Sequence, residues 1–223
     1  MTPLDRLLAL EDPEKAAGMA DYHKAPRRYL GIPVPRIEAL VDEWRAARDT
    51  GARVALADTL WQTNIHEARI AAAKLLVQAR IRPDDAVWAL FLSWVPDFDG
   101  WALADHACKV GERRLVADPT RLDIVETWTT SPHMWTRRAA LVVTLPWTRM
   151  NNPKPADQEI RRRVLSWAAV YVPDRDWFIQ KAIAWWLRDL SKHDPALARA
   201  FLAGHEAQLK PFARKEVGKY LGA

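Results

Sequence analysis

The sequence predicts an all-α protein built from stacked helix pairs. Only 8 of its 223 residues are glycine, while 49% are hydrophobic. Few stretches alternate with period two, whereas apolar residues recur with the spacing of amphipathic helices. Similar heptapeptides also recur along the chain, as repeated helical units would produce. We therefore expect one large helical core or a repeat array without a sheet.

Start and stop signals place the individual helices. Asp12 and Pro13 are a typical N-cap and first helical residue, and they predict a helix to about residue 24 that carries Tyr22. Residues 26–35 are expected to form a loop, and so is the breaker-rich stretch 146–156. The same signals predict further helices over 35–49, 52–62, 64–80, 82–95, 100–117, 118–130, 133–145, 156–171, 175–192, 195–208 and 210–221.

Tryptophan is unusually common, with 12 residues, and most of them are expected in the core. Six lie on apolar stripes and are assigned to packing: Trp44, Trp61, Trp88, Trp94, Trp128 and Trp167. Consecutive residues of a helix point about 100° apart. Of the adjacent pair Trp185 and Trp186, we therefore expect one to pack and the other to be presented to a ligand.

An internal repeat relates several of these helices. HEARIAA from His66, MWTRRAA from Met134 and WFIQKAI from Trp177 align at offsets of 68 and 43 residues, and half of 68 leads from His66 to Gly100. Units of about 35–45 residues with two helices each are typical of HEAT-like arrays, so we expect a single domain over 1–223. In this register Asp105 takes the place of a small residue in the other units: Ala71, Ala139 and Ala182.

The stretch from Gly100 to Asp105 is the first candidate site. Trp101 and Asp105 lie four residues apart, so a helix places both side chains on one face. A carboxylate in an apolar run is costly unless something positive meets it, and an indole face attracts cations. The pair therefore predicts a small site that receives positive charge. A surface carboxylate beside a core aromatic is the plainer alternative.

Charge is distributed unevenly along the chain. Residues 1–133 carry 17 Lys/Arg and 20 Asp/Glu, a net −3, whereas residues 134–223 carry 16 and 8, a net +8. A basic half predicts a polyanionic partner such as nucleic acid, although a solvated basic surface is also common. If the aligned helices face inward, Arg138, Lys181 and Trp185 converge with Trp101 and Asp105 on one surface.

Motifs for several kinds of chemistry are missing. No GxGxxG, GxxxxGK[ST], HExxH or GxSxG occurs, and the six histidines never stand at metal-ligand spacing. The single cysteine, Cys108, allows no internal disulfide and fits a reducing compartment. No signal peptide or membrane span is expected. We predict a cytoplasmic protein, with bacterial-type nucleoid-associated activity, that needs no metal and no cofactor.

Several segments together resemble the AlkD family of DNA alkylation-repair glycosylases, in order and over essentially the whole chain. They are the helix WFIQKAIAWWLR at 177–188, WTRRAA at 135–140, PEKAAGMADY at 13–22 and the turn at 30–32. The resemblance implies a superhelical solenoid of HEAT-like pairs whose concave face holds duplex DNA. It also implies an enzyme, a glycosylase of base excision repair. Such an enzyme hydrolyses the N-glycosidic bond of cationic N3- and N7-alkylated purines without a base-flipping pocket.

The resemblance also implies roles for individual residues. Trp101, Asp105 and Trp185 match the family's catalytic positions, and Tyr22 matches an aromatic residue near the lesion. Basic positions on the DNA-facing surface are matched by Arg137, Arg138, Lys181 and Arg188.

Two departures from the family pattern stand beside Trp101, where Gly100 replaces an aromatic residue and Ala102 a polar one. Relatives without glycosylase activity leave a non-catalytic module for branched or distorted DNA as the alternative. A protein-interaction scaffold is a third reading. A monomer is expected.

Overall fold

The computed structural model describes residues 1–222, and within them the chain forms thirteen α-helices, five short 3₁₀-helices and no strand. The expected all-α fold class is thus confirmed. One isolated parallel bridge joins Arg28 to Ile65. The chain divides into two compact units, Met1–Ala117 and Asp118–Ala223, and each is described by itself. The single domain over 1–223 stays a prediction, and so does its concave DNA-binding face.

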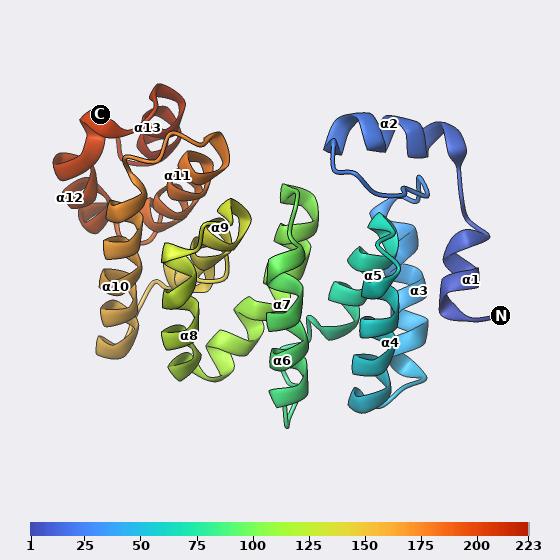
Figure 1. Cartoon of the computed structure of the whole chain (residues 1–223). Coiled ribbons are helices and arrows are strands. Elements are labelled where there is room, and N and C mark those ends of the chain that lie inside the picture. Colours follow the sequence, from blue (N-terminus) through green and yellow to red (C-terminus); the bar gives the residue numbers. More distant parts are fainter. Residues whose placement is uncertain (223) are drawn as a thin grey trace. The chain divides into compact units, whose positions relative to one another are not determined.

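The first unit is centred on helix α5 (His66–Leu76), which packs against three other helices (Figure 1). Its helices are α1 (Pro3–Leu8), α2 (Pro13–His23), α3 (Val34–Ala46), α4 (Thr50–Gln62), α5 (His66–Leu76), α6 (Asp85–Trp94) and α7 (Trp101–Ala117). Helix α5 packs against α3, α4 and α7, while α6 packs against α4 and α7. In Figure 1, α2 runs crosswise to α3 and α4.

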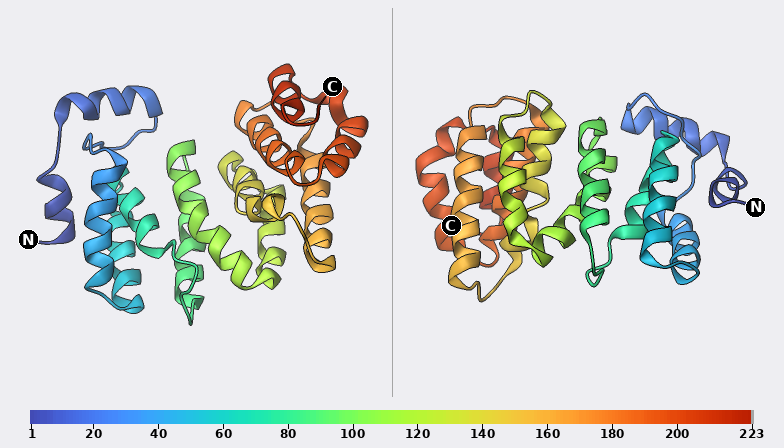
Figure 2. Two further views of the ribbon diagram at one scale, coloured as in Figure 1. Left: turned by 180° about the vertical axis from the view of Figure 1, so that it is seen from behind. Right: turned by 60° about the horizontal axis from the view of Figure 1, so that its bottom comes forward.

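The second unit repeats this plan around α11 (Figure 2). Its helices are α8 (Leu122–Thr127), α9 (Met134–Val142), α10 (Pro155–Tyr171), α11 (Trp177–Ser191), α12 (Pro195–His205) and α13 (Pro211–Gly218). Helix α11 contacts α9, α10, α12 and α13. In the part of the chain that the structure describes, no helix has the length and apolar character needed to cross a membrane.

Helix starts follow the predicted signals more closely than helix ends do. Asp12 caps α2 by accepting from the Lys15 N–H at 3.1 Å, as expected. The helix expected over 64–80 ends at Leu76, and the one over 195–208 ends at His205. A 3₁₀-helix over Leu145–Arg149 extends into the loop expected at 146–156. Helix α1 is an addition, nucleated by a capping box between Thr2 and Asp5.

The assignment of six tryptophans to the core is confirmed, since Trp44, Trp61, Trp88, Trp94, Trp128 and Trp167 are all buried. Trp61 and Trp94 stack with their ring centroids 4.3 Å apart, between α4 and α6. Of the adjacent tryptophans, Trp186 is fully buried in α11 and Trp185 is half-buried, and presentation of Trp185 to a ligand stays a prediction.

Polar side chains, buried or half-buried, fasten the loops that lead into the repeated helices. Arg69, Arg137 and Gln180 occupy the same repeat position, three residues after His66, Met134 and Trp177. Each donates to backbone carbonyls of the loop or helix end just before its own helix, at 2.9–3.1 Å. This common position is therefore a structural clamp in three helices of the two units.

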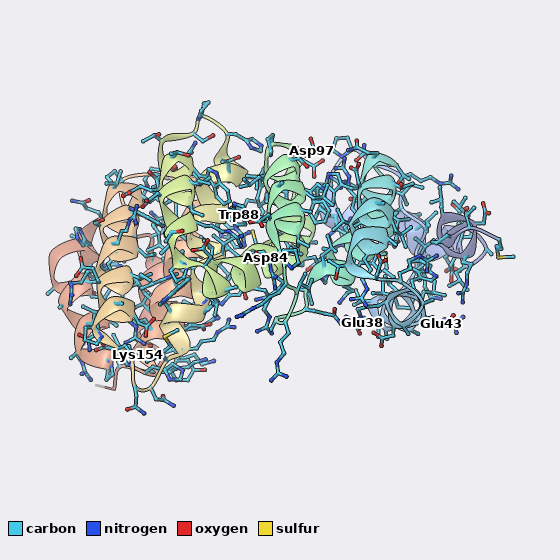
Figure 3. The ribbon with its side chains drawn as sticks, turned by 90° about the horizontal axis from the view of Figure 1, so that it is seen from below. Glu38, Glu43, Asp84, Trp88, Asp97 and Lys154 are labelled. Carbon is cyan, nitrogen blue, oxygen red and sulfur yellow. The ribbon has the colours of Figure 1, made fainter. Side chains whose placement is uncertain are left out.

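Carboxylates at the two ends of α6 fix that helix to its neighbours, and Figure 3 labels both. Asp84 accepts from the buried Arg114 of α7 at 3.0 Å. Asp97 accepts from the indole N–H of Trp61 in α4 at 2.8 Å. These bonds hold α4, α6 and α7 in register and set the position of the α7 start, where the candidate site lies.

Candidate active site

The start of α7 carries the predicted pair. Arg27, in the segment after α2, forms an ion pair with Asp99, which holds the residues before α7 against that segment. The helix then begins at Trp101, and Asp105 follows one turn later on the same face. Both side chains line a cavity of about 300 Å³ within the first unit. The structure thus brings an indole and a carboxylate together at one opening.

A cluster of aromatic rings surrounds Trp101. Tyr22, 70% exposed on α2, meets Trp101 edge to face at 6.0 Å between ring centroids. His23 lies 5.6 Å from Trp101 and 4.7 Å from His66. Tyr29 completes the group at 4.7 Å from His66. Three of the predicted site residues, Tyr22, Trp101 and Asp105, are therefore gathered in this unit.

The histidines of the cavity are uncharged at neutral pH. Burial lowers the pKa of His66 to about 3, and electrostatic interactions with His23 and Arg27 add to the effect. Burial likewise lowers the pKa of His106 to about 4, although Asp105 opposes that shift. The pKa of His23 is lowered by its burial and by Arg27. The walls around Asp105 therefore add no imidazolium charge that would repel a cationic ligand.

Apolar side chains form the remainder of the cavity. They come from four helices and the loop before α3: Met19, Ile32, Val34, Ile70 and Ala102. The ammonium group of Lys109 lies one turn beyond Asp105 and bonds to Glu112 at 2.6 Å. A carboxylate at the edge of an apolar, partly enclosed space acts on a cation more strongly than one in open solvent.

The turn at Leu30–Ile32 shapes this cavity. The buried Glu67 of α5 accepts from the backbone N–H groups of Leu30, Gly31 and Ile32, at 2.9, 2.9 and 3.3 Å. Gly31 has φ +75°, and a Cβ there would lie 2.4 Å from the Asp12 carbonyl oxygen. Only glycine fits this approach, so the turn that the sequence predicted is held both by its geometry and by a carboxylate.

The second unit gathers three of the other predicted residues, Trp185, Lys181 and Arg188, around two carboxylates. The Trp185 indole N–H donates to Asp189 at 3.2 Å, and Asp189 also pairs with Arg149 and Arg188. Glu216 of α13 pairs with Lys181 at 2.7 Å and with Arg188. With Lys192 near Asp189, four cations share two carboxylates, an excess of two positive charges. Phosphate binding by this group stays a prediction.

Arg137 and Arg138 have mainly structural surroundings. Arg137 clamps the Ser131 and Pro132 carbonyls and pairs with Asp174 at 3.0 Å. Arg138 is 3% exposed, with its guanidinium 5.6 Å from the Trp135 ring centroid. Contacts of these two arginines with DNA stay predictions.

The sequence did not single out His23, His66 and His106 as site residues. They come from α2, α5 and α7, so no local spacing joins them, and only the aligned repeat could have placed His66 near the α7 start. Among residues 1–222, no group of three or more His, Cys, Asp or Glu is arranged to hold a metal ion.

Fold and site define a class: a helical-repeat protein with a carboxylate–indole pair in one unit and a cation-rich helix in the other. The sequence matches the family model of the DNA alkylation repair enzymes over residues 4–221, so the chain belongs to that family and acts in the repair of alkylated DNA. This finding also confirms the family resemblance of its segments. No curated protein matches the chain significantly.

Solved structures share the fold. A predicted DNA alkylation repair enzyme from Enterococcus faecalis is 26% identical and has a TM-score of 0.78, covering 95% of this chain and 97% of its own. AlkD2 from Streptococcus mutans is 19% identical, with a TM-score of 0.65 and coverages of 94% and 99%. The smu.31 protein of Streptococcus mutans UA159 is 20% identical and has a TM-score of 0.64, covering 85% of this chain and 93% of its own. The last two show similarity of fold alone.

Proposed function

We propose that this protein is a DNA glycosylase that hydrolyses the N-glycosidic bond of cationic N3- and N7-alkylated purines in duplex DNA. The observation that carries the proposal is the pairing of Trp101 with Asp105 at the edge of a cavity whose histidines are neutral. Membership of the alkylation repair family supplies the class of substrate. Base excision repair is the process in which such an activity works.

Alkylation makes the purine a cation, so the C1′–N9 bond is already weakened and no strong general acid is needed. As the bond breaks, its electron pair goes to N9 and the base leaves neutral. The sugar becomes an oxocarbenium-like cation, and the oxygen of a water molecule then bonds to C1′. Asp105 stabilises the sugar cation and accepts a proton from that water. The base remains in the duplex until the bond is broken, so no flipping step is required.

The electrostatic contribution of Asp105 is large enough to matter. A carboxylate about 4 Å from a unit positive charge gains roughly 4 kcal/mol at an effective dielectric of 20. If this gain is realised only in the transition state, it accelerates cleavage about a thousandfold. Trp101 adds cation–π attraction from its ring face, and cation–π attraction is also the role we propose for Trp185 in the second unit.

In this proposal, residues of the second unit bind the duplex. Lys181, Arg188, Arg137 and Arg138 contact phosphates and set the register of the protein on DNA, while the lesion is met by Tyr22. The exposed Trp177 lies 5.9 Å from the Lys181 ammonium group and offers an additional stacking face. The protein acts as a monomer in the cytoplasm, without a metal or cofactor.

Release of free 7-methylguanine from a methylated duplex tests the proposal, with wild type and Asp105→Asn assayed in parallel in the presence of EDTA. Asp105→Asn keeps the shape and removes the charge, so we expect release to slow about a thousandfold while duplex affinity changes little. Asp42→Asn, an exposed change on α3, is the matched control. Equal release by wild type and Asp105→Asn would refute the role of Asp105. No release by either, with tight salt-sensitive binding, would favour the non-catalytic module for distorted DNA.

A further inference from the structure

Asp189 is a buried carboxylate at which four side chains of the second unit meet. The residue is 6% exposed. One of its oxygens, Oδ2, accepts from the Trp185 indole N–H at 3.2 Å and from Arg149 at 3.2 Å. The other oxygen, Oδ1, accepts from Arg188 at 3.1 Å and lies 3.8 Å from the Lys192 ammonium group. The ring of Trp185 is therefore tied to the same carboxylate as three cations.

Other indole–carboxylate bonds in the molecule fasten one element to another. Three of them join a buried tryptophan to a carboxylate of a different helix, at 2.8–3.2 Å: Trp61 to Asp97, Trp147 to Asp157 and Trp167 to Glu126. The bond between Trp185 and Asp189 instead joins two residues of one helix, a turn apart, and its ring is half-buried. This bond fastens no second element by itself, so its effect is to fix the direction in which the indole face points.

The position of Asp189 is a costly one for a carboxylate. It lies in the last turn of α11, which ends at Ser191, where the helix dipole disfavours an anion. Its burial adds a cost of desolvation, which paired cations offset only in part. The cations Arg149 and Lys192 keep 46% and 40% of their side chains exposed, so they anchor the carboxylate from the rim without covering the site. Stability alone does not favour this arrangement, whereas the need for an oriented ring explains it.

We propose that Asp189 is a positioning residue, which holds the Trp185 ring in the orientation that attracts the sugar cation. The inference rests on the proposed function, because that reaction creates the cation. An aromatic ring attracts a cation at its face and repels it at its edge, so an indole that is free to rotate loses part of the attraction. Asp189 itself acts only through the ring, since both its oxygens are already bonded inside the protein.

Single-turnover excision of 7-methylguanine from a methylated duplex, measured together with duplex affinity, tests this role. Asp189→Ala removes both acceptor oxygens, so the ring loses its fixed orientation. We expect the excision rate at saturating protein to fall about tenfold. Duplex affinity should stay unchanged or rise severalfold, because a negative charge is removed from among Arg149, Arg188 and Lys192. A variant that is only less well folded would lose both rate and affinity.

Replacement of Trp185 by benzothienylalanine isolates the bond. This amino acid keeps the bicyclic ring and carries sulfur in place of the N–H group, so it should slow excision about as much as Asp189→Ala does. The two changes together should slow excision no further than either alone, because both break the same bond. Effects that multiply would show that Asp189 acts independently of the ring, and they would overturn the proposal.

Asp157→Ala is the matched control. It removes the acceptor of the buried Trp147 indole in the same unit, so it should leave both the excision rate and the duplex affinity as in wild type. Thermal unfolding shows that each variant is folded. The benzothienylalanine protein retains Asp189 and its ion pairs, and it keeps the test decisive if Asp189→Ala does not fold.

Labelling with fluorotryptophan gives a readout that needs no reaction. The fluorine resonance of Trp185, identified by its loss in Trp185→Phe, should be single and sharp in the wild type and broadened or split in Asp189→Ala. An equally sharp resonance in Asp189→Ala, or unchanged excision by that variant, overturns the proposal. Absence of excision by the wild type refutes the glycosylase instead, and the resonance then decides the role of Asp189 by itself.

Discussion

Replacing Glu67 by glutamine tests how the cavity is held together. In the wild type, one carboxylate oxygen accepts from Leu30 N–H and the other from the N–H groups of Gly31 and Ile32. Glutamine keeps the shape but has one oxygen and one NH₂ group. Whichever way the amide turns, its NH₂ group faces at least one backbone donor, so that donor is left without an acceptor.

The magnitude follows from these three bonds. Losing one charge-assisted bond costs about 1.5–3 kcal/mol, and the orphaned buried N–H adds about 1–3 kcal/mol. Avoiding the burial of a charge offsets part of this loss. We therefore expect Glu67→Gln to lower the free energy of unfolding by about 3 kcal/mol.

Urea unfolding followed by circular dichroism and tryptophan fluorescence measures the change. Glu38→Gln is the control, because Glu38 is exposed and pairs with Lys74 in a surface ion pair worth less than about 1 kcal/mol. A free energy within about 0.5 kcal/mol of wild type for Glu67→Gln would refute the view that this carboxylate holds the turn.

Two further predictions concern charge. Since the unfolded chain protonates His66 near its ordinary pKa of 6.5 and the folded chain only at about 3, the stability that this residue contributes is complete above pH 6.5 and falls below it. The loss is about 2 kcal/mol at pH 5. His66→Phe should remove this part of the fall in the free energy of unfolding between pH 7 and pH 5, which urea titrations at both pH values measure. An unchanged fall would contradict the reasoning. Glu216→Gln releases Lys181 and Arg188 from their shared carboxylate, so it should tighten duplex binding severalfold and steepen its salt dependence by about one charge. Anisotropy titrations check this against Glu159→Gln, an exposed i,i+3 pair with Arg162, and equal behaviour of the two variants would argue against it.

The sequence predicted the helices well because their starts carry chemical signals. Asp12 caps its helix through a side-chain bond, as expected from the sequence. Asp49 and Asp176 cap helices in the same way, although the helices expected over 35–49 and 175–192 had included them. Helix ends depend more on tertiary contacts. The residues after Leu76 leave the helix where the buried Arg114, 38 positions further along the chain, binds the carbonyls of Gln78 and Ala79. A contact at that distance gives no local signal.

The candidate site was predictable only where its residues share a helix. Trp101 and Asp105 were found from a spacing of four, which one helix converts into proximity. His23, His66 and His106 lie 43 and 40 residues apart, and only the packing of α2, α5 and α7 brings them to one cavity. Their neutrality also comes from burial, which the sequence does not state.

Charge alone could not separate clamping arginines from those that meet a ligand. The family resemblance implied a DNA contact for Arg137, and in the structure this side chain bonds to loop carbonyls and to Asp174. The aligned repeat does contain the distinction, because Arg69 and Gln180 stand at the same position and bind carbonyls in the same way. A polar residue that recurs at one repeat position therefore has a role in the fold, and contact of Arg137 with DNA stays a separate prediction.

Helix α7 departs from the repeat at two positions, that of the polar clamp and that of the small alanine, and one explanation fits both departures. Where the other helices carry a polar clamp, α7 has the buried Leu103, and its start is held instead by the pairing of Arg27 with Asp99. Where they carry an alanine exposed by 2% or less, α7 has the half-buried Asp105 beside the cavity. A carboxylate does not fit the close packing that an alanine allows, so the space and the charge must have entered the fold together. Packing for stability alone favours neither a cavity nor a carboxylate, so the pair is best explained by a ligand that needs both.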